Sequence, residues 1–294
     1  MVRFGDAERR ILSYFVKGTQ IIHNGKNLIV QEAGKPTCAQ GEPKTDIYIR
    51  ASNQIESEEI KISYKKENAD FLENKTNAER AEQLFGSDWR WIIEQSTTNI
   101  QSSFERRMRI YKERFAKTEK GAITLGWKFE LMNKPSGELS GNMILTPEQV
   151  YDVYAGTNLS VDKCNAKVNG KVITDSGIAD YILVSDDVNS AQDIIDQIIP
   201  IQDYVTMHPN IYFACKALNY RSFVAKYDGN RPLAVQVDWR IEAGKLVSEL
   251  VFDRPLEWNG NEVADRLIEC MEVLRIKTTD DICFDNADMS YVYE

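Results

Sequence analysis

The sequence predicts a mixed α/β protein, and three observations carry that prediction. Segments with apolar residues at helical spacing follow segments in which apolar and polar residues alternate, along the whole 294-residue chain. Hydrophobic residues make up 43% and charged residues 28% of the chain, which suits a protein with a sizeable core. No repeat with a period of about 20 to 50 residues is visible, so a solenoid is not expected.

Helices and strands alternate in the first half of the chain. The expected elements, in order, are a helix over residues 5–16, a hairpin over 19–30, strands over 45–50 and 58–64, helices over 77–85 and 88–117, strands over 122–132 and 139–145, and a helix from 146. Asn24-Gly25 is the turn signal of the hairpin, because both residues tolerate a left-handed backbone. Thr146 is a good N-cap and Pro147 a good first residue for the last helix.

The second half is also mixed. Its expected elements are a strand over 180–185, a helix over 190–199, strands near 211–216, 233–241 and 245–252, and a helix over 261–275. Polarity rises between Gly156 and Asn169, and we expect a domain boundary there. The chain then divides into a first domain over residues 1–156 and an α+β extension over residues 157–294.

The charge of the chain is unevenly distributed. It has 36 Lys and Arg against 45 Asp and Glu, a net charge of −9, which argues against a protein that coats nucleic acid indiscriminately. Residues 1–150 carry a net charge of +2 and residues 151–294 a net charge of −11. Any contact with nucleic acid is therefore expected in the first half, with the acidic residues 261–294 facing away.

The rarer residue types limit the chemistry. The chain has two histidines and five cysteines and no Cys-x-x-Cys pair, so neither a His-rich metal site, a zinc knuckle nor a Ser-His-Asp triad is indicated. The N-terminus lacks a signal-peptide layout and no apolar stretch is long enough to span a membrane, so we expect a cytoplasmic protein without membrane contact. Any catalysis is expected to use carboxylates and lysines.

Three ionisable residues stand out on the two strands after the hairpin. Asp46 opens the first strand, and Glu59 and Lys61 lie on the second with Ile60 between them. Because side chains alternate along a strand, Glu59 and Lys61 share one face while Ile60 points to the core. If the strands pair, we expect the three groups to converge. A hairpin whose solvent face carries ordinary cross-strand charge pairs is the alternative explanation.

Two carboxylates and a lysine aimed at one point suit phosphodiester hydrolysis with Mg²⁺, or with Mn²⁺ in its place. Carboxylate oxygens are the ligands that Mg²⁺ prefers, and the ion neutralises charge on the phosphate and lowers the pKa of a bound water. A lysine beside the ion can orient or deprotonate that water. The pattern therefore predicts a metal-dependent hydrolase.

The stretch from Pro43 to Lys61 resembles the PD-(D/E)xK nuclease superfamily, to which type II restriction endonucleases belong. The resemblance extends weakly over residues 62–75, and it departs from the idealised pattern because Lys44 and Thr45 separate Pro43 from Asp46. It implies a restriction-endonuclease-like mixed central sheet flanked by helices, with the catalytic core in residues 1–156. Residues 157–294 would then serve target recognition or dimerisation.

The resemblance also implies roles for individual residues. They are Asp46 and Glu59 as catalytic carboxylates and metal ligands, Lys61 as the catalytic lysine, and the carbonyl group of Ile60 and the carboxylate of Glu8 as further metal ligands. For Glu8, an exposed glutamate on the first helix is the alternative.

A nuclease with this net charge needs a local basic surface. Between Glu105 and Lys120 there are seven basic and three acidic residues on the expected helix, although a solvated helix face with i,i+4 ion pairs explains them equally well. The residues expected to contact DNA, here or just after the motif, are Lys65, Lys66, Asn68, Arg106, Arg107, Arg109 and Lys112.

These observations together predict a Mg²⁺-dependent endonuclease of double-stranded DNA, most similar to a type II restriction enzyme that leaves 5′-phosphate ends. Since each chain carries one expected site, symmetric cleavage of both strands implies a homodimer. Two alternatives stay open. One is a structure-specific or repair nuclease of the same superfamily, and the other is a noncatalytic acidic binding protein.

Overall fold

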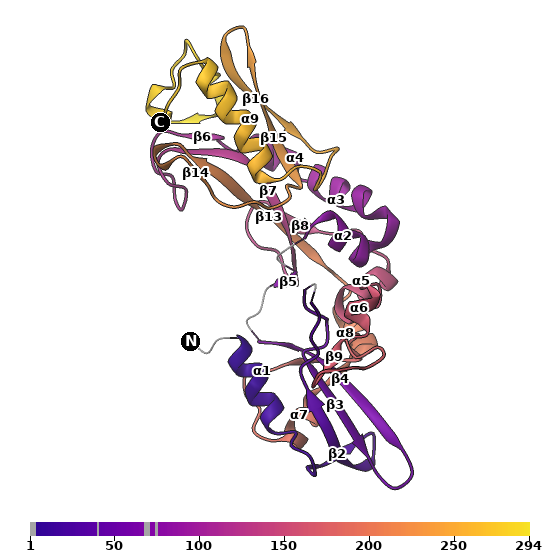
Figure 1. Ribbon diagram of the computed structural model, residues 1–294. Helices are drawn as coiled ribbons and strands as arrows, with labels where there is room; N and C mark the ends of the chain where they lie inside the picture. The colour runs from indigo at the N-terminus through magenta and orange to yellow at the C-terminus, as the bar shows by residue number, and fades with distance from the viewer. Residues whose placement is uncertain (1–3, 40, 68–70, 74–75) are drawn as a thin grey trace. The chain divides into compact units, whose positions relative to one another are not determined.

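The computed structural model describes residues 4–39, 41–67, 71–73 and 76–294, and the chain forms two compact units. Unit 1 consists of Met1–Asp70, Gln83–Gly86 and Leu145–Asn210, and unit 2 consists of Phe71–Glu82, Ser87–Ile144 and Ile211–Glu294. Both units combine helices with strands (Figure 1), so the predicted mixed α/β class is confirmed.

Unit 1 is built on a six-stranded mixed sheet in the order β1-β2-β3-β4-β11-β12. Its strands are β1 (Gln20–His23), β2 (Lys26–Gly34), β3 (Ile47–Ser52), β4 (Ser57–Lys65), β11 (Tyr181–Val184) and β12 (Ile199–Pro200). The first four strands pair antiparallel with their neighbours, whereas β11 runs parallel to β4. The remaining elements are α1 (Phe4–Ser13), α5 (Pro147–Ala155), α6 (Val161–Cys164), β9 (Lys167–Val168), β10 (Lys171–Val172), α7 (Ala191–Gln197) and α8 (Ile201–Met207).

Local sequence signals explain two of these elements. Asn24 and Gly25 have φ values of 49° and 76°, so both occupy the left-handed region that a tight hairpin turn between β1 and β2 requires. At the start of α5, the Thr146 side chain accepts the backbone N–H of Gln149, and the Gln149 side chain accepts the N–H of Thr146. The predicted hairpin and the predicted helix start at residue 146 are confirmed.

One face of the unit 1 sheet is closed by helices. Ile11 of α1 and Ile194 of α7 belong to one buried core with Ile49 of β3 and with Ile60 and Ile62 of β4. The core position of Ile60 was expected from strand alternation. Glu59 and Lys61, which alternate with Ile60 and Ile62 along β4, therefore point away from this core.

Unit 2 is a nine-stranded sheet whose main path is β14-β13-β7-β15-β16. Its strands are β5 (Phe71–Glu73), β6 (Ile110–Tyr111), β7 (Ala122–Met132), β8 (Ser140–Asn142), β13 (Tyr212–Arg221), β14 (Lys226–Tyr227), β15 (Val235–Glu242), β16 (Lys245–Val251) and β17 (Val292–Tyr293). Its helices include α3 (Trp89–Thr98), α4 (Gln101–Glu105) and α9 (Gly260–Val273), while α2 (Ala78–Phe85) contributes residues to both units. None of the described helices is long and apolar enough to cross a lipid bilayer.

The two units do not divide at residue 156. Residues 145–210 belong to unit 1 because β11 pairs with β4, with Tyr181 opposite Ile62. Such a parallel partner is separated from its neighbour by a long connection, and strand pattern alone does not reveal which strands will become neighbours.

The predicted helix over residues 88–117 is also different in the structure. Helix α3 ends at Thr98 and α4 at Glu105, and Ile110 and Tyr111 then form the strand β6. Ile110 pairs with Val292 of β17 and with Ile123 of β7, so contacts far along the chain override the local helical pattern.

Candidate functional site

Several strands of unit 1 end at the same edge of its sheet. Strands β2, β4 and β11 all finish there, because β4 and β11 are parallel to each other and β3 runs antiparallel between β2 and β4. Lys35 follows β2, Asp46 precedes β3 and Lys65 is the last residue of β4.

Asp46 is held by the backbone of β4. Its N–H donates to the carbonyl of Ile62 at 2.9 Å, and its carboxylate accepts the N–H of Tyr64 at 2.8 Å. Asp46 is therefore level with residues 62–64 of β4, at the end of the strand. The residue is partly buried, and the surrounding protein desolvates its carboxyl group enough to affect its ionisation.

The surroundings of Asp46 make its carboxyl group a weaker acid than usual. Burial, with a smaller contribution from the nearby carboxylate of Glu8, raises the pKa of Asp46 to about 6. The positive charge of Lys65, the N–H of Tyr64 and the charge of Lys35 act in the opposite direction but do not cancel these effects. A more highly charged cation at this place would favour the ionised form.

Glu8 lies on α1 and is buried rather than exposed. Only 9% of the residue is accessible, and its Oε2 lies 2.6 Å from Nζ of Lys35. Burial opposes the charge on Lys35, but the hydrogen bond with Glu8 and the charges of Glu42 and Asp46 raise the pKa of the lysine. The alternative of an exposed helical glutamate is therefore wrong, whereas a role for Glu8 in holding a metal stays a prediction.

Ser63 and Lys65 are the residues that the sequence motif did not single out. They alternate with Ile62 and Tyr64 of the core, and Ser63 is buried while Lys65 is partly exposed. Lys65 exerts the largest charge effect on the pKa of Asp46. We call Glu8, Lys35, Asp46, Ser63 and Lys65 the Asp46 cluster.

Glu59 and Lys61 lie further down the same strand. Across the hairpin, Glu59 is opposite Arg50 and Lys61 is opposite Tyr48, whereas Asp46 is level with Ser63. Glu59 and Ser63 are four positions apart, which corresponds to roughly 13 Å along a strand. Asp46 and Glu59 are therefore not brought together at one point.

Lys61 and Glu59 have partners of their own. Nζ of Lys61 lies 3.3 Å from Oδ2 of Asp180 and donates to the carbonyl of Asp175 at 3.2 Å. The buried hydroxyl of Tyr48 donates to Oε1 of Glu59 at 2.7 Å. We call these five residues the Lys61 cluster. Ile60 is fully buried and pairs with Ile49, so its carbonyl belongs to this part of the hairpin and not to the level of Asp46.

The donor set limits which metal could be held. Within the described ranges, no three His, Cys, Asp or Glu side chains gather closely enough to form a metal site. Mg²⁺ does not need three, because it keeps several waters and is commonly held by one or two carboxylates together with substrate phosphates. Asp46 and Glu8 could meet that requirement, since among the described residues Asp46 accepts one backbone N–H and Glu8 pairs through one oxygen with Lys35.

Glu130 of unit 2 shows how the charge of a buried carboxylate is balanced elsewhere in the chain. It is 2% exposed, and its two oxygens lie 2.6 Å from Nζ of Lys128 and 2.7 Å from Nζ of Lys216. Both oxygens thus face an ammonium group. Among the residues that the structure describes, Asp46 has a backbone N–H and no ammonium group at comparable distance, which distinguishes it from a carboxylate that completes an ion pair.

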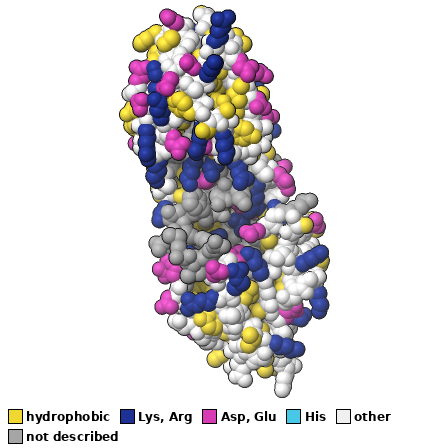
Figure 2. Space-filling view, turned by 60° about the vertical axis from the view of Figure 1, so that its left-hand side comes forward, with side chains coloured by type: hydrophobic (Ala, Val, Ile, Leu, Met, Phe, Trp, Pro, Cys, Tyr) yellow, Lys and Arg dark blue, Asp and Glu magenta, His cyan; other side chains and the backbone are white. Residues whose placement is uncertain are grey.

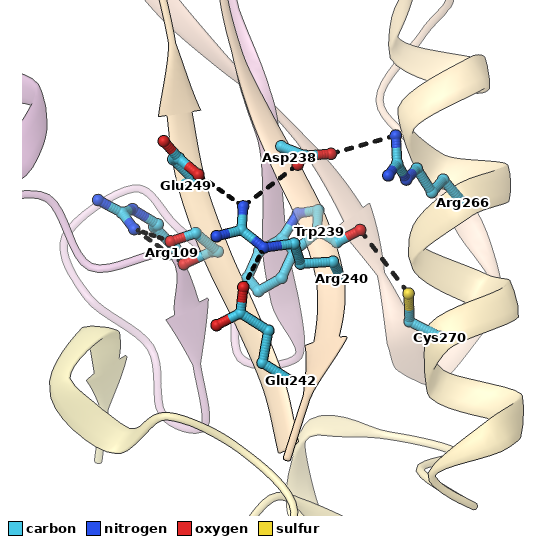
Figure 3. Close-up of polar contacts among 9 residues, drawn as sticks. Arg109, Asp238, Trp239, Arg240, Glu242, Glu249, Arg266 and Cys270 are labelled. Carbon is cyan, nitrogen blue, oxygen red and sulfur yellow. Dashed lines mark hydrogen bonds and ion pairs between the residues drawn. The ribbon is translucent and has the colours of Figure 1, made fainter. Parts of the chain in front are cut away.

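The predicted DNA-contacting residues of the region 106–112 do not form one basic surface. Arg109 is 3% exposed and donates to the carbonyl and hydroxyl of Ser248 at 3.0 and 2.8 Å (Figure 3). Its guanidinium group also stacks on the ring of Tyr291. Burial lowers its pKa. The expectation that Arg109 contacts DNA is wrong, because its guanidinium group is part of the core of unit 2.

The neighbours of Arg109 differ in exposure. Arg107 pairs with Glu138 at 2.8 Å, Lys112 pairs with Glu294 at 2.9 Å, and Arg106 is exposed on the surface. Acidic side chains accompany basic ones over the visible face of unit 2, in the upper part of Figure 2. Arg240 illustrates this pairing, since Asp238, Glu242 and Glu249 all bind it (Figure 3).

Three further predicted DNA contacts follow the motif. Lys65 lies beside Asp46, as described above, and Lys66 is partly buried next to it. Asn68 lies outside the described residues.

Comparisons with known proteins add no relative. No protein-family model matches the chain, and searches of curated proteins and of solved structures found no match either.

Proposed function

We propose that this chain is a Mg²⁺-dependent endonuclease with a restriction-endonuclease-like core in unit 1, and that its active site is centred on Asp46. The observation that carries the proposal is the pair of carboxylates, Asp46 and Glu8, held beside Lys65 and Lys35 where three strands finish. The order of elements supports it: a helix, a series of antiparallel strands, and a parallel strand added next to β4.

The residues of the Asp46 cluster fit the chemistry of metal-assisted phosphodiester hydrolysis. Asp46 and Glu8 would hold Mg²⁺, which supplies charge neutralisation at the phosphate and a water of lowered pKa. The N–H of Tyr64 fixes the Asp46 carboxylate, so that one of its oxygens stays oriented. The ammonium group of Lys65 would orient the attacking water or stabilise negative charge on the phosphate oxygens.

This assignment departs from the sequence motif in one respect. At the level of Asp46 the chain reads Ser63-Tyr64-Lys65, which keeps the lysine of the acid-x-Lys pattern and replaces the acid by serine. Glu8 would then supply the second carboxylate from α1. Glu59 and Lys61 match the pattern in sequence, but we assign them to stabilisation of the hairpin.

The expected substrate is double-stranded DNA, cut to leave 5′-phosphate ends. One Asp46 cluster per chain supports one strand cut per chain, so cleavage of both strands at one place would need two copies. We therefore propose a homodimer acting in the manner of a type II restriction enzyme.

The proposal is tested by incubating the purified protein with supercoiled plasmid and with linear viral DNA, in Mg²⁺, in Mn²⁺ and in EDTA. Metal-dependent cleavage that is lost in Asp46→Asn and kept in Glu59→Gln supports it. Discrete fragments indicate a restriction enzyme, and a preference for branched or damaged DNA indicates a repair nuclease. If the folded protein cleaves none of these substrates with either ion, the proposed function is wrong.

A further inference from the structure

Lys35 is the one member of the Asp46 cluster that makes a direct ion pair with a cluster carboxylate. Its Nζ lies 2.6 Å from Oε2 of Glu8, whose side chain is 12% exposed. The Lys35 side chain itself is 34% exposed, so its ammonium group contacts a buried carboxylate on one side and solvent on the other. It can therefore leave Glu8 without entering a closed interior.

On the proposed function, a metal held by Glu8 would need the carboxylate that Lys35 contacts. Lys35 pairs directly with Glu8, and its charge also has a small effect in favour of the ionised form of Asp46. The two cations cannot both approach Glu8 closely, because like charges repel strongly at a partly buried site.

We propose that the ammonium group of Lys35 takes the place of the metal ion as the partner of Glu8 when no divalent cation is bound. In the absence of a divalent cation its ammonium group neutralises Glu8, and binding of Mg²⁺ displaces it from that carboxylate. The displaced ammonium group then turns toward solvent with open donors, where a DNA phosphate is its natural partner. This inference rests on the proposed function, because it concerns the same site.

A consequence is that metal and DNA assist each other through Lys35. Without DNA, Mg²⁺ must displace Lys35 from Glu8 and leave the ammonium group without an ionic partner, which weakens metal binding. With DNA present, a phosphate takes the place of Glu8 as that partner. By thermodynamic linkage, DNA raises the affinity for the metal by the same factor as the metal raises the affinity for DNA.

The test is calorimetric titration of the full chain with MgCl₂ and no DNA. Lys35→Met keeps the length of the side chain and removes the charge, so its affinity for Mg²⁺ should rise by about five- to tenfold. Lys35→Arg keeps the charge and should bind as the wild type does. Lys26→Met is the matched control, because Lys26 is the first residue of the strand that Lys35 follows, and it bridges Glu56 and Glu58 at 2.8 and 2.7 Å outside the cluster.

The outcomes separate this inference from the proposed function. If Asp46→Asn abolishes Mg²⁺ binding while Lys35→Met binds the ion no more tightly than the wild type, the role of Lys35 is overturned and the nuclease site stands. If Asp46→Asn binds Mg²⁺ as the wild type does, both fail. Circular dichroism confirms folding, and Lys35→Gln, which keeps a donor to Glu8, replaces Lys35→Met should the latter not fold.

Discussion

Two polar clusters on the same hairpin differ in how their charges are satisfied. In the Lys61 cluster, Lys61 has two oxygen partners and Glu59 accepts a hydrogen bond from a buried tyrosine. Burial raises the pKa of Asp180 there, and the charge and hydrogen bond of Lys61 act against that rise. In the Asp46 cluster, burial and a second acid raise the pKa of Asp46 to about 6. The candidate site is therefore marked by Asp46, whose carboxylate needs a cation, and not by Glu59, which matches the motif.

The largest expected effect is on cleavage. Asp46→Asn removes the proposed metal ligand but keeps an oxygen that can accept the N–H of Tyr64, and we expect DNA cleavage to fall by at least about a thousandfold. Glu59→Gln keeps an acceptor for Tyr48 and should change the rate by less than about threefold. A plasmid nicking assay measures both. Equal losses of cleavage rate in Asp46→Asn and Glu59→Gln would show that the two clusters do not differ in function.

The lysines provide the second contrast. Lys65→Met should lower the cleavage rate by about a hundredfold or more, the usual loss on removing a group that assists proton transfer or stabilises charge. Lys61→Met should leave the rate nearly unchanged, because Lys61 is already bound to Asp180 and to the carbonyl of Asp175. Single-turnover kinetics at saturating Mg²⁺ measures both variants. A larger loss of rate in Lys61→Met than in Lys65→Met would show that Lys61, the lysine of the motif, is the catalytic one.

Asp46→Asn should raise the stability of the protein, although it lowers the cleavage rate. The folded pKa of Asp46, about 6, lies above the ordinary value of 3.8, so the folded state binds the proton more tightly and ionisation costs stability. That cost is absent below about pH 4 and complete above about pH 6. Asp46→Asn, which cannot ionise, should therefore be more stable than the wild type by about 1 to 3 kcal/mol at pH 7 without metal, and equally stable at pH 4.

Urea unfolding of Asp46→Asn and of the wild type, in EDTA at pH 7 and at pH 4, measures these two differences in stability. An Asp46→Asn variant that is less stable at pH 7 would show that the carboxylate contributes to the fold in the way Glu59 does.

The smallest expected effect is the stability of the Lys61 cluster. The Lys61 side chain is 12% exposed, but its partner Asp180 is 43% exposed, so solvent weakens their attraction. Lys61→Met should lower the free energy of unfolding by about 1 kcal/mol or less. Thermal unfolding of Lys61→Met beside the wild type gives the value, and a loss several times larger would mean that this ion pair supports more of the hairpin than its exposure suggests.

Much of unit 1 could be predicted from local sequence. The Asn24-Gly25 turn, the Thr146 cap and the burial of Ile60 all follow from preferences within a few residues. The residue of β4 that lies opposite Asp46 could not be predicted in this way. Alternation along β4 decides which face Glu59 and Lys61 occupy, but it does not decide how the two strands are aligned. The same strand face that carries Glu59 and Lys61 also carries Ser63 and Lys65, and only the pairing separates the two pairs.

Long-range contacts account for the remaining differences. The region from Arg106 to Lys112 resembles a basic helix in sequence, yet Ile110 pairs with Val292 and Arg109 is buried against Ser248 and Tyr291. Those partners lie more than a hundred residues away along the chain, beyond the reach of helical periodicity. Similarly, Glu8 belongs to the polar face of its helix in the sequence, whereas in the structure it is buried and pairs with Lys35, 27 residues further along the chain.

The most direct test of the account is the thermal unfolding of three proteins, the wild type, Asp46→Asn and Glu59→Gln, with and without Mg²⁺ and in the absence of DNA. A cation that binds only the folded state raises the melting temperature. The account predicts an equal Mg²⁺-dependent rise for the wild type and Glu59→Gln, and none for Asp46→Asn. A rise that survives in Asp46→Asn and disappears in Glu59→Gln would contradict it and place the metal at the motif glutamate.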